Sequence, residues 1–149
     1  MIESDQDVWR GGLTQDLSQV LLSAAQIQSR VATLGRTLTT DYQEKDPLLV
    51  GILSGSFLFH ADLVRNMNLP LAVDFMAVSS YGDRTSSSGV VRILKDLNSS
   101  IAGRHVVIIE DIVDTGLTLD YLVKNLETRR PASLKVCALL DKKEARVRD

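Results

Sequence analysis

One apolar run that stops abruptly at acidic residues constrains this chain more than any other stretch. Residues 106–109 read Val-Val-Ile-Ile, and Glu110 and Asp111 follow them directly. A run of this kind predicts a strand that is buried on both faces, as in a parallel sheet covered by helices. Residues 114–118 then read Asp-Thr-Gly-Leu-Thr, a polar turn, before a helical pattern begins. Ligands of open α/β sheets bind beyond the carboxyl ends of the strands, so this stretch is a candidate site.

The rest of the chain alternates short apolar runs with helical patterns. This order predicts one doubly wound α/β domain over residues 1–149, with a mostly parallel sheet. Strands are expected at residues 48–53, 73–79, 90–97, 106–109 and 134–140, the last of them buried. One helix should be capped at Ser23 and run to near Tyr42, and two more should cover residues 57–67 and about 117–128. The strand–helix–strand unit over residues 48–79 implies a parallel pair with a right-handed crossover.

Two polar segments stand outside this pattern. Residues 1–16 hold Trp9 as their only large anchor, so an N-terminal arm and a disordered tail are equally good interpretations. Residues 80–89, which begin with Ser80 and Tyr81, are rich in Ser and Gly and predict a mobile loop between two strands. A plain linker is the alternative. A long polar loop inside a compact domain is more often a lid or a binding loop, and we favour that interpretation.

Composition excludes several classes of protein. The net charge is −2 and the pI is about 5.7, so the chain has no basic footprint for nucleic acid. A single cysteine excludes an intrachain disulfide and is typical of a reducing compartment. No apolar run approaches the roughly 18 residues of a membrane span, and the acidic N-terminus lacks the layout of a signal peptide. We therefore expect a cytoplasmic protein without nucleic-acid or membrane partners.

The chemistry of the turn points to a sugar phosphate. A helix that starts near residue 117 directs free backbone N–H groups at a phosphate, and Gly116 permits a close approach. The acids Glu110 and Asp111 suit sugar hydroxyls or water-mediated Mg²⁺. The chain has no Gly-Lys-Ser/Thr of a nucleotide P-loop. Taken alone, Asp114 would be a helix N-cap. A receiver-type acidic pocket is excluded because residues 48–53 are followed by Ser-Gly-Ser instead of acids.

These residues resemble a known family. Residues 110–118 read Glu-Asp-Ile-Val-Asp-Thr-Gly-Leu-Thr, which resembles the phosphoribosyl diphosphate (PRPP) motif of type I phosphoribosyltransferases. Further stretches resemble the bacterial hypoxanthine-guanine phosphoribosyltransferase family, at residues 47–53, 73–82, 88–97 and 139–142. The resemblance runs from about residue 20 to the end of the chain. It implies the type I fold and an Mg²⁺-dependent salvage reaction, in which hypoxanthine or guanine and PRPP give IMP or GMP and diphosphate.

The resemblance implies roles for the residues of the turn. Glu110 and Asp111 would face the ribose hydroxyls and hold Mg²⁺, and Asp111 would contact PRPP. Asp114 would be the general base near N7 of the purine. The 5′-phosphate would be held by Thr115, Gly116, Leu117 and Thr118.

Six further positions receive roles in the same way. Lys142 would donate a hydrogen bond to the C6 oxygen, which excludes adenine because adenine carries an amino donor there. Ile112 would contact the purine. Ser54 and Gly55 would offer backbone amides to the diphosphate. Ser80 and Tyr81 would begin a flexible loop that closes over the sugar and excludes water.

Two features depart from the family's pattern. Many members carry Lys where Ser54 stands, and we expect weaker PRPP binding at most, because the grip of this turn is largely main-chain. Members also continue beyond Asp149 into hood strands that carry an aromatic residue for the purine, an Asp for Mg²⁺ and an Arg for the diphosphate. We therefore expect the C-terminal part of the family domain to be missing, either because the chain is a fragment or because it is a natural truncation with an impaired base site.

The same sequence allows two other functions. A regulator that senses PRPP or nucleotides, or an inactive fragment, is the alternative; the net charge of −2 argues against a nucleic-acid-binding regulator. The resemblance implies a homodimer or homotetramer. Among the isolated groups, His60 and His105 are expected at the surface or as caps, Cys137 in the core, and Arg146 on an exposed tail.

Overall fold

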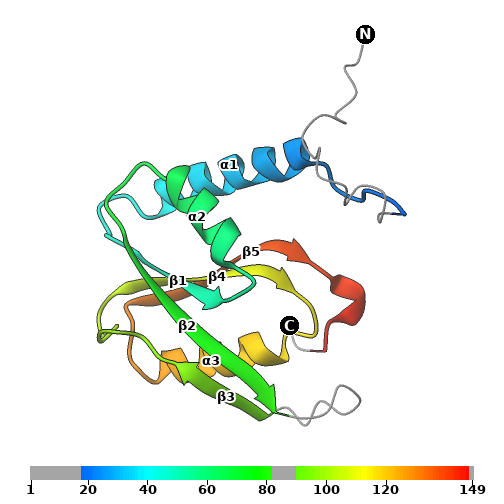
Figure 1. Cartoon of the computed structure of the whole chain (residues 1–149). Helices are drawn as coiled ribbons and strands as arrows, with labels where there is room; N and C mark the ends of the chain where they lie inside the picture. Colours follow the sequence, from blue (N-terminus) through cyan, green and yellow to red (C-terminus); the bar gives the residue numbers. More distant parts are fainter. Residues whose placement is uncertain (1–17, 82–89, 148–149) are drawn as a thin grey trace.

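A central sheet of five strands organises the computed structural model, which describes residues 18–81 and 90–147 (Figure 1). The strands are β1 (Leu48–Leu53), β2 (Ala72–Tyr81), β3 (Val90–Lys95), β4 (His105–Val113) and β5 (Ser133–Asp141). Their order across the sheet is β3-β2-β1-β4-β5. All neighbours are parallel except β2 and β3, which pair antiparallel. The predicted mostly parallel sheet with one two-stranded excursion is confirmed.

Helices cover both faces of the sheet. The helices α1 (Ala24–Asp41) and α2 (Phe57–Arg65) lie on one face and α3 (Leu117–Glu127) lies on the other (Figure 1). Each face has its own apolar core, and β4 contributes to both because alternate residues point to opposite faces. Val107 and Ile109 pack under α1 and α2, whereas Val106 and Ile108 pack toward α3. All four are fully buried, which confirms the predicted strand with two covered faces.

The start of α1 follows from its sequence. The Ser23 hydroxyl accepts a hydrogen bond from the Gln26 backbone N–H at 3.2 Å, and the Gln26 side chain accepts one from the Ser23 N–H at 2.8 Å. This is the predicted capping box. Farther along, Gly35 lets α1 approach α2 closely, since a Cβ there would lie 2.5 Å from the Asn66 carbonyl oxygen. The two helices therefore form one layer.

The chain reverses its direction of winding between β1 and β4. From β1 it passes through α2 to β2 on one side, and from β4 it passes through α3 to β5 on the other. Strand β4 pairs with β1 only as far as Ile109, which lies opposite Gly51, but pairs with β5 as far as Val113. The last residues of β4 therefore project past β1. We expected Glu110 and Asp111 at the end of this strand, but pairing with β5 carries the strand through them.

A buried carboxylate joins β2 to the segment after β3. Asp74 accepts hydrogen bonds from the Asn98 backbone N–H at 2.8 Å and the Asn98 side-chain amide at 2.9 Å. It also accepts one from the Phe75 N–H at 2.7 Å, and the Lys95 ammonium lies 3.4 Å away. Burial opposes ionisation of Asp74, but these donors together hold its pKa below the usual value. The cluster fixes the end of the sheet opposite the β4 turn.

Several expectations about burial were wrong. Strand β5 was expected to be buried, but its only buried residue is Cys137, while Val136 and Leu140 are 41% and 36% exposed. The reason is its position at the edge of the sheet. His60 was expected at the surface but is 1% exposed. His105 is half-buried, and its Nδ1 lies 2.7 Å from the Ser133 hydroxyl. The core position of Cys137 is confirmed.

Two predicted segments lie outside the described residues. They are the N-terminal arm and residues 82–89 of the predicted loop. Ser80 and Tyr81 are the last residues of β2, where their backbones pair with Val91 and Val90 of β3. Within the described part of the chain, no helix combines the length and the apolar character that crossing a membrane requires.

Candidate functional site

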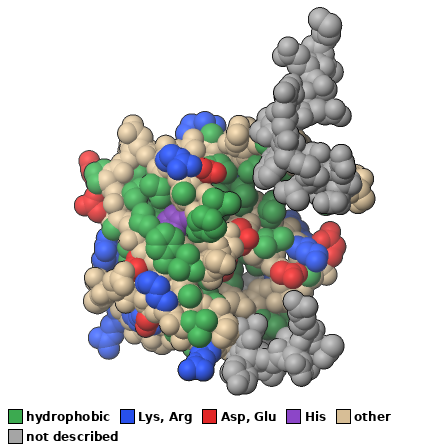
Figure 2. Space-filling view, in the orientation of Figure 1, with side chains coloured by type: hydrophobic (Ala, Val, Ile, Leu, Met, Phe, Trp, Pro, Cys, Tyr) green, Lys and Arg blue, Asp and Glu red, His purple; other side chains and the backbone are tan. Residues whose placement is uncertain are grey.

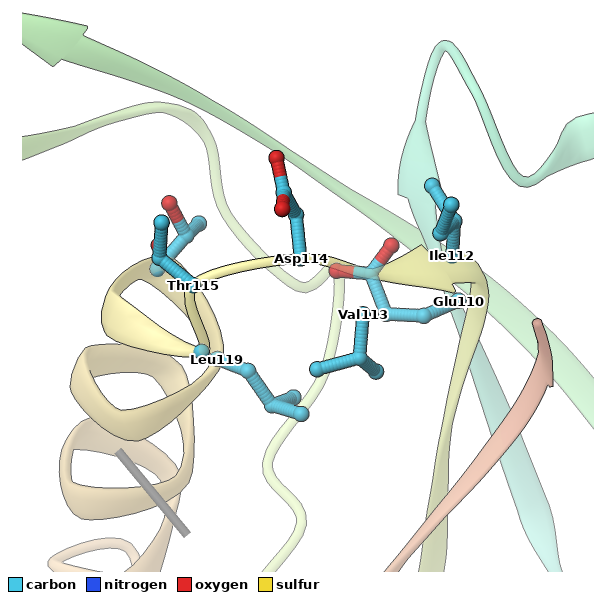
Figure 3. A pocket seen from close by; sticks show the side chains of 8 residues that line it. Glu110, Ile112, Val113, Asp114, Thr115 and Leu119 are labelled. Carbon is cyan, nitrogen blue, oxygen red and sulfur yellow. The ribbon is translucent and has the colours of Figure 1, made fainter. Parts of the chain in front are cut away.

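A cavity of about 230 Å³ opens at the carboxyl end of β4 (Figure 3). Its walls come from the last residues of β4, the turn that follows and the first residues of α3. The lining residues are Glu110, Ile112, Val113, Asp114, Thr115, Gly116, Thr118 and Leu119. The position agrees with the rule for open α/β sheets, because β4 borders the point where the winding direction reverses.

The start of α3 differs from a side-chain-capped helix. Its N-cap residue is Gly116, which has a φ of 82° and no side chain to cap with. This left-handed conformation favours glycine, so the turn depends on that residue. The Thr115 Oγ1 lies 3.4 Å from the Leu117 nitrogen, which is a long contact for a hydrogen bond. The N-terminal N–H groups of α3 thus remain available for an anion at the cavity.

Asp114 is not the N-cap of α3, so the interpretation that it only caps the helix was wrong. It stands two residues before the N-cap, is exposed, and points its carboxylate away from α3 (Figure 3). The Glu110 carboxylate enters the same cavity from the strand (Figure 3). Two carboxylates and a helix N-terminus therefore share one small space. A ligand with both hydroxyl and phosphate groups satisfies these opposite charges together.

Glu110 has an unusual protonation equilibrium. Burial, and secondarily the charge of Asp111, raise its pKa from 4.5 to about 7. Near neutral pH the free protein therefore holds this carboxyl in both its protonated and its charged form. A cation or a hydroxyl donor at the cavity would stabilise the charged form. Perturbed acids in a cavity are typical of functional sites.

Asp111 faces the turn after β1 instead of the cavity. A Cβ on Gly55 would lie 2.9 Å from Asp111 Oδ2 and 3.1 Å from Oδ1, so the carboxylate rests against the glycine backbone. Ser54 and Gly55 are both exposed, and the Leu53–Ser54 peptide bond is cis. The fold thus brings Gly55 and Asp111 together, although about 55 residues separate them in sequence. The sequence does not predict that these two residues are in contact.

The segment after β5 packs against the same turn. The Lys142 backbone N–H donates to the Val113 carbonyl at 2.9 Å, and the Val147 N–H donates to the Thr115 carbonyl at 2.9 Å. Between them lies a short 3-10 helix, η2 (Lys143–Ala145). The Arg146 guanidinium pairs with Asp141 and is half-buried, so the expectation of an exposed tail was wrong at this residue. The Lys142 side chain is exposed and does not line the cavity.

The structure gathers most of the predicted turn residues but not all of the predicted site. Six of them share the cavity: Glu110, Ile112, Asp114, Thr115, Gly116 and Thr118. Gly55 lies against Asp111, but Ser54, Gly55, Asp111 and Leu117 do not line the cavity. Val113 and Leu119 also line the cavity, and sequence reasoning did not assign them to the site. The amphipathic pattern of α3 predicts that Leu119 faces the core, and in the structure that side of the helix also forms a wall of the cavity.

The residues present fit Mg²⁺ as part of a complex with substrate. Carboxylate oxygens are the ligands that this ion prefers, and it usually keeps waters and binds through one or two carboxylates plus phosphates. Glu110 and Asp111 supply such oxygens, and Asp111 is held against Gly55. In the described part of the chain, no group of three or more His, Cys, Asp or Glu side chains is arranged to hold a metal. PRPP oxygens would have to complete the coordination.

Comparison with known proteins agrees with this arrangement. Residues 21–149 match the family described as the phosphoribosyl transferase domain, and the chain belongs to that family. It is 54% identical over 137 residues to a hypoxanthine-guanine phosphoribosyltransferase of Mycobacterium avium, covering 88% of this chain and 68% of that relative. It is 47% identical over 137 residues to the one of Bacillus subtilis, covering 92% and 76%.

A solved structure matches the fold as well. The hypoxanthine phosphoribosyltransferase of Staphylococcus aureus is 46% identical and superposes with a TM-score of 0.88. The match covers 92% of this chain and 74% of that one. The resemblance noted in the sequence is confirmed, and so is the type I phosphoribosyltransferase fold.

Proposed function

We propose that this chain is a purine-salvage transferase that joins hypoxanthine or guanine to PRPP. The products are IMP or GMP and diphosphate. The observation that carries the proposal is the cavity that two carboxylates, Glu110 and Asp114, share with the N-terminus of α3, in a chain of the phosphoribosyl transferase domain family. Such a cavity suits a sugar phosphate, whose hydroxyls meet carboxylates while its phosphate meets backbone N–H groups.

In the proposed reaction each residue has a limited task. The backbone N–H groups of residues 116–118 hold the 5′-phosphate, and Glu110 and Asp111 accept hydrogen bonds from the ribose hydroxyls. The same carboxylates would hold Mg²⁺, which would neutralise charge on the diphosphate. As the bond from the anomeric carbon to the diphosphate breaks, N9 of the purine bonds to that carbon. Asp114 accepts the proton that leaves N7.

The exposed position of Asp114 supports this task. A general base must reach the proton that it removes, and its carboxylate is exposed at the cavity, free of α3 capping. Asp114→Asn should lower kcat by about 100-fold or more, as expected for loss of a general base. A matched control is Asp120→Asn, since Asp120 lies on α3 outside the cavity and pairs with Lys124 at 2.8 Å.

The experiment is an assay of nucleotide formation from PRPP, Mg²⁺ and each purine in turn. IMP or GMP formation that is lost in Asp114→Asn and kept in Asp120→Asn supports the proposal. Undiminished turnover by Asp114→Asn would contradict the role of the base. Binding of PRPP without any turnover would instead favour the sensing regulator.

Base selection is proposed to rest on Lys142, with Ile112 against the purine. The Lys142 backbone is fixed beside the cavity by its hydrogen bond to Val113, and Ile112 is 42% exposed at the cavity wall. An ammonium only donates hydrogen bonds, so it favours an oxygen at C6 over an amino group. Lys142→Met should raise KM for hypoxanthine and reduce the preference for hypoxanthine over adenine. Lys143→Met at the neighbouring exposed position is the control. Turnover of adenine and not hypoxanthine by the unaltered protein would refute this role.

We further propose that the protein forms a homodimer or homotetramer in the cytoplasm. Hydrophobic side chains gather over α2 and β2 (Figure 2), and Phe57, Leu58 and Val73 are 51%, 65% and 43% exposed. An apolar patch of this kind is typical of an interface. The free, buried Cys137 is compatible with a reducing compartment. Light scattering after size-exclusion chromatography measures the assembly, and a monomeric mass at micromolar concentration would contradict it. Cell fractionation tests the location.

A further inference from the structure

A buried histidine lies behind the turn that borders the site. His60, on α2, is 1% exposed, and neither of its ring nitrogens has a hydrogen-bond partner in the described structure. Buried polar groups are normally paired, so this side chain needs an explanation. A neutral imidazole can be tolerated there, but an imidazolium would be a buried charge without a partner.

The ring is pressed against the backbone of β1. A Cβ on Gly51 would lie 2.4 Å from His60 Nδ1 and 3.0 Å from the Phe75 ring, so only glycine allows this approach. The Phe75 ring of β2 packs against the imidazole in a tilted arrangement, with ring centroids 5.2 Å apart and planes inclined at 56°. His60 therefore sets the distance between the first turn of α2 and the strands beneath it.

That first turn is continuous with the turn at the site. The His60 backbone N–H donates to the Ser56 carbonyl at 2.8 Å, and the buried Ser56 hydroxyl donates to the Ile52 carbonyl at 2.7 Å. One residue earlier, Gly55 lies against the Asp111 carboxylate. A displacement of α2 away from β1 would thus move residues 54–56 relative to Asp111.

The surrounding charges offer the imidazolium no partner. Strand β1 has no ionisable side chain. On β2, Asp74 is bonded to Asn98 and Lys95, and on α2, exposed Asp62 pairs with Arg65. The nearest acid of β4, Asp111, lies at Gly55, and the charged residues of α1 are exposed: Arg30, Arg36 and Asp41. Burial is accordingly the cause that lowers the pKa of His60.

We propose that His60 is a positioning residue for the Ser54–Ser56 turn, and that protonation of its ring loosens this turn and weakens PRPP binding. The inference rests on the proposed function for the identity of the ligand. Because the neutral ring is the form that fits, the packing is intact at neutral pH and is lost as the pH falls below the ordinary histidine range. The purine side of the cavity, built from the end of β4 and α3, should be affected less.

The test compares KM for PRPP across pH in three variants and the unaltered protein. His60→Phe and His60→Leu both remove the titrating ring. Their side chains differ in shape, so that one variant can be used if the other does not fold. His105→Gln is the matched control, since the chain has two histidines and His105 lies at the opposite end of β4. PRPP itself titrates, but that effect is common to all four proteins. NMR titration of the two histidine rings and of the Ser54–Ser56 amides provides a readout that needs no turnover.

Between about pH 7.5 and 5.0, KM for PRPP should rise about fivefold more in the unaltered protein and in His105→Gln than in either His60 variant, a coupling at the low end for linked sites. KM for hypoxanthine should change equally in all four proteins. The Ser54–Ser56 amides should shift with pH only where His60 is present. An identical pH dependence of KM for PRPP in all four would overturn the proposal. If no nucleotide forms at any pH, the proposed function fails, and the amide shifts still decide whether His60 controls the turn.

Discussion

Removal of the Glu110 charge should stabilise the free protein. The pKa of this carboxyl is raised from 4.5 to about 7, first by burial and then by Asp111. A raised acid pKa means that the folded state binds the proton more tightly than the unfolded state does. Stability therefore falls as the pH rises from about 4.5 through 7 and levels off above that range.

The size of the effect follows from the two pKa values. Each tenfold difference in proton affinity is worth about 1.4 kcal/mol, so ionising Glu110 at about pH 8.5 costs the folded state up to about 3 kcal/mol. Glu110→Gln keeps the shape and has no charge, so it should be more stable than the unaltered chain by about 1–3 kcal/mol at that pH. At about pH 4.5 the two proteins should be equally stable. Asp111→Asn removes only the weaker cause of the raised Glu110 pKa, the charge of Asp111, and should therefore give a smaller gain in stability.

The assay is urea unfolding followed by circular dichroism at several pH values, without PRPP and Mg²⁺. Glu127→Gln, at an exposed glutamate near the end of α3, controls for the loss of one negative charge. Addition of PRPP with Mg²⁺ should stabilise the unaltered chain more than Glu110→Gln, so that the unaltered chain becomes the more stable of the two. Equal stabilities at about pH 8.5, or a gain that persists undiminished at about pH 4.5, would refute the argument from burial.

Three substitutions test the packing that holds the site in place. Asp74→Ala should lower the free energy of unfolding by about 3 kcal/mol, because it leaves buried donors unpaired, and an unchanged urea midpoint would contradict this. Gly55→Ala places a Cβ 2.9 Å from Asp111 Oδ2 and should raise KM for PRPP about tenfold while leaving KM for hypoxanthine alone. Gly51→Ala places a Cβ 2.4 Å from His60 Nδ1 and should destabilise the fold by about 1–3 kcal/mol in thermal unfolding; a stability equal to that of the unaltered chain would show that the ring moves freely.

Local pattern was sufficient for most of the fold. The apolar run at residues 48–53 coincides with β1, and the capping box at Ser23 begins α1, because each signal lies within a few residues of the structure that it specifies. The turn at residues 114–118 could be predicted as a candidate site because its polar residues are contiguous in sequence. Asp114 taken alone suggested a helix cap, but the N-cap is Gly116, and the left-handed conformation of Gly116 is a property of the folded turn.

Burial was less predictable where it depends on neighbours. The sequence pattern of an apolar strand is the same in the middle of a sheet and at its edge. The exposure of β5 could therefore be found only from the order of the strands. His60 is polar and lies on an amphipathic helix, yet it is buried because Gly51 and Phe75 provide a space for its ring. No pattern within α2 carries that information.

Residues that are adjacent in the chain were enough to predict the strands and helices, the candidate site at residues 114–118 and the resemblance to phosphoribosyltransferases. Which distant groups meet depends on how the elements pack. The tertiary structure placed Gly55 against Asp111, raised the pKa of Glu110 to about 7 by burial, and enclosed His60 between α2 and β1. The physical reason is that burial and proximity are properties of packed elements, whose relative positions no single stretch of sequence specifies.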